Sequence, residues 1–157
     1  MIKRVSKGES QLYKTLRLKA LKDSPSAFGA TYEDAVLRSD QSWQDQSDAA
    51  AEGSDKAIFL INEPSISGMA AIYREEEGSS IGQLFQMWVS PEARGSNTAK
   101  DILQYALSWA EEHRYSKILA EVTKGNTRAL KFYKKFGFVD SHHSSDSDTH
   151  ALEIALV

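Results

Sequence analysis

The chain has no cysteine among its 157 residues. A disulfide framework, a thiolate nucleophile and a thiolate metal site are therefore excluded. The chain also lacks an apolar run of membrane-spanning length, and no signal-peptide stretch follows Met1-Ile2-Lys3-Arg4. From these absences we expect a cytoplasmic protein that has no membrane partner.

Basic residues are not in excess, because 19 Lys and Arg stand against 22 Asp and Glu and give a net charge of -3. Nucleic-acid binding favours a basic surface, so we expect no nucleic-acid partner. The hydrophobic fraction of 41% and the charged fraction of 26% are typical of a globular protein. No repeat or linker divides the chain, and we expect one domain over residues 1–157, as a monomer or a homodimer.

The first third of the chain predicts an edge strand, two helices and a polar loop. The strand covers residues 2–5. Apolar residues at three- and four-residue spacing predict a helix over 9–23 and a weaker one over 31–38. Residues 39–55 are polar, with Trp43 as their only large apolar group, and we expect a loop there.

The rest of the chain predicts strands with two intervening helices. Strands at 57–61, 66–74 and 81–89 have short connections, which favour an antiparallel meander. A helix over 95–113, a strand over 117–122, a helix that starts at Gly125-Asn126-Thr127 and ends at about Phe136, and a hairpin of 138–141 with 149–157 follow. The strand–helix–strand order predicts that 81–89 and 117–122 run parallel. We expect an α/β (α+β) fold whose mixed, mostly antiparallel sheet has about six to seven strands, with about four helices.

The stretch from Gln86 to Ala99 joins an apolar strand to a helix through a tight polar turn. Pro91 stops the strand, and Arg94-Gly95-Ser96-Asn97 forms the turn. A helix N-terminus presents unpaired N–H groups and the positive end of the helix dipole. We therefore predict that the turn binds the diphosphate of a nucleotide-like cofactor. A plain connection between strand and helix is the alternative.

Two segments resemble the acetyl-CoA-binding motifs of the GCN5-related N-acetyltransferases. The first is Met87-Trp88-Val89-Ser90-Pro91-Glu92-Ala93-Arg94-Gly95, and the second runs from Asn126 to Phe138. The resemblance implies a sheet that is splayed between the strands at 81–89 and 117–123. It also implies transfer of the acetyl group of acetyl-CoA to a primary amine of a small molecule, peptide or protein by direct attack. No metal is implied.

The resemblance further implies which residues contact acetyl-CoA. They are Met87, Trp88, Val89, Arg94, Gly95, Ser96, Asn97, Thr98, Ala99, Asn126, Ala129 and Tyr133. Asn97 stands where the family pattern has glycine, and we expect it to copy the left-handed glycine conformation. By spacing, Arg128, Lys131 and Lys135 share one helical face. That face is either solvated or partly directed at the phosphates of the cofactor.

Tyr133 is the predicted catalytic residue. Its spacing with Phe132 and Phe136 alone is typical of a core position, whereas the resemblance implies a hydroxyl that protonates the leaving thiolate. Asn126 is expected to cap the last helix, and the resemblance adds a hydrogen bond to the cofactor. The general base stays open between Glu121, Glu33 and a water bound by Gln86.

The acceptor amine is expected between the first two helices, the loop with Phe28 and Trp43, and the closing hairpin. A non-catalytic sensor or scaffold that binds acetyl-CoA or CoA is the alternative function, and a nucleotide-binding domain of other chemistry is a third. A metal cluster of His142, His143, Asp146, Asp148 and His150 is disfavoured because adjacent strand residues point to opposite faces.

Overall fold

One mixed sheet runs through the computed structural model, which describes residues 1–25, 30–142 and 148–156. Its order over these residues is β1-β2-β3-β4-β5-β7-β6. The strands are β1 Ile2–Arg4, β2 Lys56–Ile61, β3 Gly68–Arg74, β4 Ile81–Val89, β5 Lys117–Thr123, β6 Val139–Asp140 and β7 Thr149–Ala155. Only β4 and β5 pair in parallel. The predicted meander, crossover and closing hairpin are therefore confirmed.

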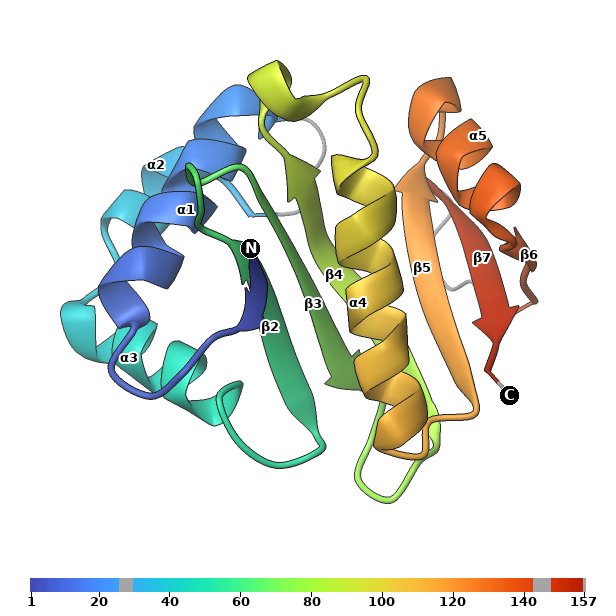
Figure 1. Cartoon of the computed structure of the whole chain (residues 1–157), viewed down its shortest axis with the longest axis horizontal. Coiled ribbons are helices and arrows are strands. Elements are labelled where there is room, and N and C mark those ends of the chain that lie inside the picture. The colour runs from blue at the N-terminus through green and yellow to red at the C-terminus, as the bar shows by residue number, and fades with distance from the viewer. Residues whose placement is uncertain (26–29, 143–147, 157) are drawn as a thin grey trace.

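Helices cover both faces of this sheet (Figure 1). They are α1 Ser10–Asp23, α2 Tyr32–Val36, α3 Asp40–Ala49, α4 Thr98–Glu112 and α5 Thr127–Phe136. Side chains alternate along β2, so Ile58 and Leu60 pack with α1 and α3, whereas Phe59 packs with α4. In the described part of the chain, no helix is both long and apolar enough to cross a membrane.

The helix α3 corrects our expectation of a loop over 39–55. Ser39 caps it, since the Ser39 side chain accepts a hydrogen bond from the Ser42 amide at 3.1 Å. Trp43 is fully buried and meets the Tyr13 ring edge-on at 5.6 Å between centroids. Ser47 is buried one turn further along the same face. One aromatic anchor thus holds an otherwise polar helix. The described residues form five α-helices rather than the expected four or so.

The strand β4 is bulged and separates from β5, in agreement with the splay that the resemblance implied. Met69 pairs with Trp88 and Ala71 with Phe85, which leaves Gln86 and Met87 together opposite one residue of β3. Gln86 adopts a φ of 57°. The β4–β5 register extends only over residues 81–83 and 117–119. Beyond this short ladder the two strands diverge towards the end of β4 (Figure 1).

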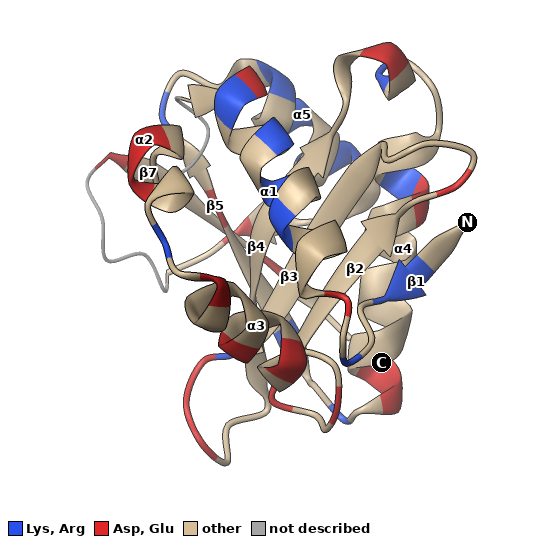
Figure 2. Cartoon of the chain, turned by 90° about the vertical axis from the view of Figure 1, so that its left-hand side faces the viewer, with Lys and Arg blue, Asp and Glu red and all other residues tan. Residues whose placement is uncertain are grey.

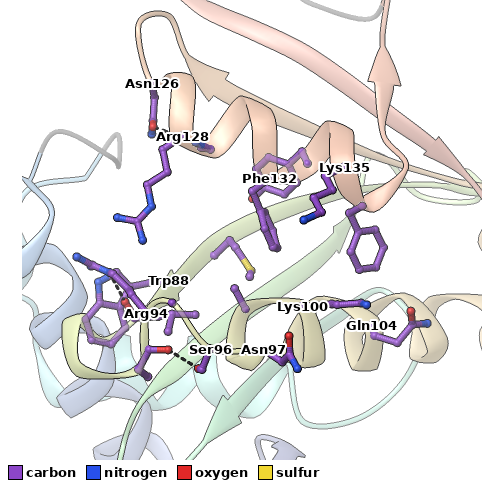
Figure 3. A pocket seen from close by; sticks show the side chains of 18 of the residues that line it. Trp88, Arg94, Ser96, Asn97, Lys100, Gln104, Asn126, Arg128, Phe132 and Lys135 are labelled. Carbon is purple, nitrogen blue, oxygen red and sulfur yellow. Dashed lines mark hydrogen bonds between the residues drawn. The ribbon is translucent and has the colours of Figure 1, made fainter.

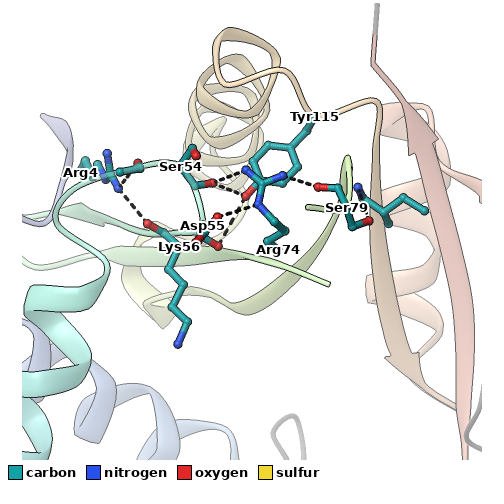
Figure 4. A network of polar contacts seen from close by, with 9 residues as sticks. Arg4, Ser54, Asp55, Lys56, Arg74, Ser79 and Tyr115 are labelled. Carbon is teal, nitrogen blue, oxygen red and sulfur yellow. Dashed lines mark hydrogen bonds and ion pairs between the residues drawn. The ribbon is translucent and has the colours of Figure 1, made fainter. Parts of the chain in front are cut away.

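A polar network around Arg74 holds the closed end of the splay together (Figure 4). The Arg74 Nε donates to Asp55 Oδ1 at 2.8 Å, and Nη2 donates to the Ser54 carbonyl at 3.0 Å. Nη1 donates to the Ser79 carbonyl. The guanidinium also lies 4.5 Å from the centroid of the Tyr115 ring. These contacts tie β3 to the segments beside β4 and β5 where those strands are still paired.

Candidate active site

A cleft of about 720 Å³ opens between α4 and α5 at the splayed end of β4 (Figure 3). Every predicted cofactor-binding residue except Thr98 lines it. The two sequence motifs, which are far apart in the chain, therefore form the two walls of one cavity. Ser24, Ala93, Lys100, Gln104, Arg128, Phe132, Lys135 and Phe136 complete the lining.

The turn before α4 presents free backbone donors to this cleft. Gly95 has a φ of 82°, a left-handed conformation that a side chain would strain. Among the described residues, the N–H groups of Gly95, Ser96, Asn97 and Ala99 have no hydrogen-bond partner. Successive free donors at a helix N-terminus are suited to binding an anion. The arrangement fits a diphosphate without any further ligand.

Asn97 does not copy a left-handed glycine, and that expectation was wrong. Asn97 has a φ of -82° and a ψ of 8°, which any residue adopts. The left-handed step falls two residues earlier, at Gly95, so position 97 does not need glycine for its backbone. The Ser96 hydroxyl instead organises the helix start, donating to the Ala93 carbonyl at 2.6 Å and accepting from the Thr98 amide at 3.4 Å.

Asp23, at the end of α1, anchors the first motif. Its Oδ2 accepts hydrogen bonds from Trp88 Nε1 at 3.0 Å and from Arg94 Nη2 at 2.6 Å. The hydrogen bond from Trp88, followed by those from Ser24 and Arg94, lowers the pKa of Asp23. Arg94 Nε also donates to the Val89 carbonyl at 3.0 Å. The Arg94 guanidinium therefore fixes the turn to β4 and α1.

Three basic side chains surround the cleft. Arg128 and Lys135 extend from α5, and Lys100 faces them from α4 (Figure 3). Lys131 is not among the lining residues. Within the described chain none of the three forms an ion pair, whereas neighbouring Lys134 pairs with Asp140 at 2.9 Å. Helical spacing predicted that Arg128 and Lys135 share a face of α5, whereas nothing in the sequence indicated that Lys100 lines the cleft.

Tyr133 lies in the inner wall of the cleft with 8% of its surface exposed. The rings of Phe132 and Phe138 meet its ring edge-on, with centroids 5.4 and 5.2 Å away. Burial is the one cause acting on the hydroxyl, and it raises the pKa of Tyr133 above that of an ordinary tyrosine. The phenol therefore keeps its proton at neutral pH.

Asn126 begins the second wall. Its Oδ1 accepts a hydrogen bond from the Ala129 amide at 3.2 Å, so the predicted helix cap is confirmed. Gly137 follows the last residue of α5 with a φ of 132°, a conformation that favours glycine. The cap holds α5 with its basic face towards the turn of the first motif.

Comparison with known proteins identifies the family. A sequence model described as the acetyltransferase (GNAT) family matches residues 18–138. The chain belongs to this family. The two motifs indicated the same family.

Similar proteins agree with this fold. The acetyltransferase of the GNAT family from Streptococcus pneumoniae superposes with a TM-score of 0.81 at 16% identity, covering 100% of this chain and 99% of that one. Spermidine N-acetyltransferase from Vibrio cholerae, in complex with CoA and spermine, gives 0.76 at 15% identity, covering 99% and 94%. At such identities the likeness establishes the fold alone.

A curated relative is similar over part of its length. Mycothiol acetyltransferase of Thermobispora bispora is 23% identical over 132 residues, which are 83% of this chain and 43% of the relative. The GNAT chain thus spans less than half the length of that relative.

A second cavity of about 290 Å³ lies beside the bulge of β4 in this acetyltransferase. It is lined by Arg17, Leu21, Ala30, Thr31, Asp34, Ala35, Arg38, Trp43, Gln46 and Gln86. The location agrees with the walls expected at the first two helices and Trp43, whereas no described residue of the closing hairpin, also expected there, lines the cavity. Phe28, also expected there, lies outside the described residues.

The candidate general bases are not equally placed. Glu33 and Glu121 are exposed and line neither cavity. Gln86 lines the smaller cavity, where its Oε1 accepts from the Tyr13 hydroxyl at 2.9 Å and its Nε2 donates to the Tyr73 hydroxyl at 3.3 Å. Only the Gln86 alternative therefore lies beside a cavity.

The histidine-rich hairpin loop is only partly described. His150 Nε2 lies 2.7 Å from Asp140 Oδ1, an ordinary pair between neighbouring strands. In the described parts of the chain, no group of three or more His, Asp or Glu residues could hold a metal. His143 and Asp146 lie outside the described residues.

Proposed function

We propose that this GNAT protein transfers the acetyl group of acetyl-CoA to a primary amine by direct attack across the bulge of β4. The observation that carries the proposal is the pair of cavities at this bulge. Gln86 lines the smaller cavity and the adjacent Met87 lines the cleft. A donor bound in the cleft and an acceptor bound in the cavity would therefore meet across two consecutive residues.

The cleft has the groups that a coenzyme A molecule needs. Free N–H groups of the turn from Gly95 to Ala99 would hold the diphosphate, and Lys100, Arg128 and Lys135 would balance its charge. Acetyl-CoA, when bound, supplies the acetyl group as a thioester. Because β4 has no β5 partner beyond residue 83, the segment Met87–Val89 keeps backbone groups available to the bound molecule. Preorganised backbone donors of this kind contribute about 3 to 4 kcal/mol to a transition state.

Tyr133 is the residue that we assign as the general acid. Tyr133 lines the cleft and its hydroxyl retains its proton, which is the state that donation to a leaving thiolate requires. The absence of cysteine agrees with direct attack, since an acyl-cysteine route is excluded. The amine must lose a proton before it attacks, and a water held by Gln86 is the base candidate placed beside a cavity.

Two similar proteins support an amine acceptor. One is the spermidine N-acetyltransferase of Vibrio cholerae in complex with CoA and spermine, and the other is mycothiol acetyltransferase. The similarity supports the reaction type. It does not carry their acceptors to this chain, because the identities are 15% and 23%.

Thermal unfolding followed by turnover tests the proposal. A ligand at a hundred times its dissociation constant stabilises the folded state by about 2.7 kcal/mol, so acetyl-CoA and CoA should both raise the Tm. Release of the free thiol in the presence of an amine panel then measures transfer. No rise of the Tm with either ligand contradicts the proposal. A rise without turnover on any amine identifies the non-catalytic sensor instead.

A further inference from the structure

The smaller cavity is lined by two guanidinium groups. Arg17 enters it from α1 with 9% of its surface exposed, and Arg38 enters it from the segment after α2. Among the described residues that line the cavity, Asp34 is the one carboxylate, and it is exposed. Arginine stays charged in proteins, so the walls carry more positive than negative charge.

Neighbouring groups hold Arg38 in place. The Arg38 guanidinium lies 3.9 Å from the centroid of the Trp43 ring, and Nε donates to Ser42 Oγ at 3.0 Å. Its contacts within the described chain include no carboxylate. Burial lowers the pKa of Arg17, and the positive charge of Arg38 acts in the same direction. Two like charges kept near one another in a partly buried cavity repel, and a bound anion would relieve that repulsion.

Gln86 lies between the cavity that contains the two arginines and the cleft in which acetyl transfer is proposed. The Tyr13 and Tyr73 hydroxyls hold its amide at the wall of the cavity. The next residue, Met87, already belongs to the cleft. If a ligand in the smaller cavity places its amine at the bulge of β4, the rest of that ligand would therefore lie beside Arg17 and Arg38.

We propose that the acceptor is a small amine that also carries an oxyanion, either a carboxylate or a phosphoryl group, which Arg17 and Arg38 bind. The inference rests on the proposed acetyl transfer and specifies its substrate class. Arginine forms paired, charge-assisted hydrogen bonds with such groups. A volume of about 290 Å³ favours a small molecule, since ligand pockets span about 300 to 1,000 Å³. Polyamines carry only positive charge, so the two arginines would repel them.

A matched set of amines tests this substrate class. Glycine, β-alanine and γ-aminobutyrate carry a carboxylate at three distances from the amine, and 2-aminoethylphosphonate carries the phosphoryl alternative. Ethylamine, propylamine, butylamine and spermidine lack an oxyanion. We expect kcat/KM for the best oxyanion amine to exceed that of its alkylamine counterpart and of spermidine by at least about tenfold. Comparison of β-alanine with the phosphonate identifies the oxyanion.

The variant Arg38→Gln tests the residue assignment. Loss of a charged hydrogen-bonding partner should reduce kcat/KM for the oxyanion amine about 10- to 100-fold, mainly through KM, and leave alkylamines little changed. Arg114→Gln, which removes an arginine that lines neither cavity, is the matched control and should keep the wild-type preference. Arg17→Gln should act like Arg38→Gln, and a preserved rise of the Tm with CoA confirms that each variant is folded.

Different results would contradict the proposed acetyl transfer and the proposed oxyanion site. Calorimetric titration of the CoA-bound protein with the same amines needs no turnover, so it tests the oxyanion site even if no acetyl group is transferred. Binding of a carboxylate or phosphonate amine that Arg38→Gln abolishes supports the site. Equal binding and equal kcat/KM for oxyanion amines, alkylamines and spermidine would overturn it while leaving acetyl transfer intact.

Discussion

The cleft and the smaller cavity lie at the same bulge of β4 but are built in different ways. The cleft is formed by two segments that are far apart in the chain, residues 87–104 and α5, and its ligand-facing groups are free backbone amides and exposed cations. The cavity is formed by α1, the segment 30–38 and α3, which follow one another in the chain, and by Gln86 of β4, with fully buried Trp43 in its wall. Basic side chains gather on α1 and α5, while α3 carries acidic ones (Figure 2).

Function and stability are coupled to different extents in the cleft and in the cavity. Side chains at an exposed cleft contribute to binding and chemistry but little to folding, because they bury little apolar surface. Side chains that wall the cavity also belong to the core, since Trp43 and Leu21 are packed with α1 and α3. Substitutions of the exposed cleft cations should therefore change activity at constant stability, and those of the buried side chains around the cavity should change both.

Replacement of Tyr133 by Phe should give the largest effect on the cleft side. Loss of a general acid lowers the rate about 10²- to 10⁴-fold, whereas the ring packing with Phe132 and Phe138 is kept. Thiol release measures kcat, and the rise of the Tm with CoA should be unchanged. Tyr105→Phe, on the exposed side of α4, is the matched control. Unchanged turnover in Tyr133→Phe would remove this hydroxyl from the mechanism.

Replacement of Trp43 by Ala should give the largest effect on the cavity side. Truncation of a fully buried tryptophan leaves a void and reduces the free energy of unfolding by about 3 to 5 kcal/mol. Urea unfolding measures the loss. Leu37→Ala is the control, because Leu37 is 84% exposed and surface changes alter stability by only about 0.5 kcal/mol. Losses of equal size in both variants would contradict the anchoring of α3.

Neutralising the cleft cations together should weaken CoA binding without unfolding the protein. The triple variant Lys100→Gln, Arg128→Gln and Lys135→Gln should raise the Kd about 10- to 100-fold at low salt, because three charges that face the cleft are lost. The effect should shrink at high salt, where exposed charges are screened. Lys131→Gln, on the same helix but outside the cleft, should leave the Kd unchanged. Equal Kd values for all these proteins would exclude the cations from phosphate binding.

Substitution of Asn126 should have the smallest effect. Two variants distinguish its role as the cap of α5 from its predicted hydrogen bond to the cofactor. Asn126→Ala removes the cap of α5 and should reduce stability by about 0.5 to 2 kcal/mol. Asn126→Ser keeps a capping side chain and should retain stability, as serine is an equally good cap. Calorimetry with CoA then measures what the amide itself contributes. If the Kd of Asn126→Ser equals that of the wild type, Asn126 acts only as a cap.

The strands and the cleft could be predicted because their signals are local. Short connections determine that the strands at 57–61, 66–74 and 81–89 form a meander, and a glycine-containing turn before a helix exposes its amides wherever it occurs. The identity of the residues in the turn was less informative than the turn itself. Gly95, not Asn97, takes the left-handed conformation.

The helix α3 and the arginine cavity could not be predicted in the same way, since both depend on how neighbouring helices pack against one another. The cap at Ser39 and the spacing of Trp43, Ser47 and Ala50 are visible in the sequence, but hydrophobicity alone is too low to mark a helix. No motif marks Arg17 in the sequence. Only the packing of 30–38 and α3 against α1 turns it into a cavity wall.

A crystal structure of the protein with bound CoA tests the central claim most directly. We expect the diphosphate to lie on the amides of Gly95 to Ala99, between Lys100 and Arg128. We also expect the thiol to lie within hydrogen-bond distance of the Tyr133 hydroxyl. A CoA molecule bound outside the cleft between α4 and α5, or with its thiol remote from Tyr133, would contradict it.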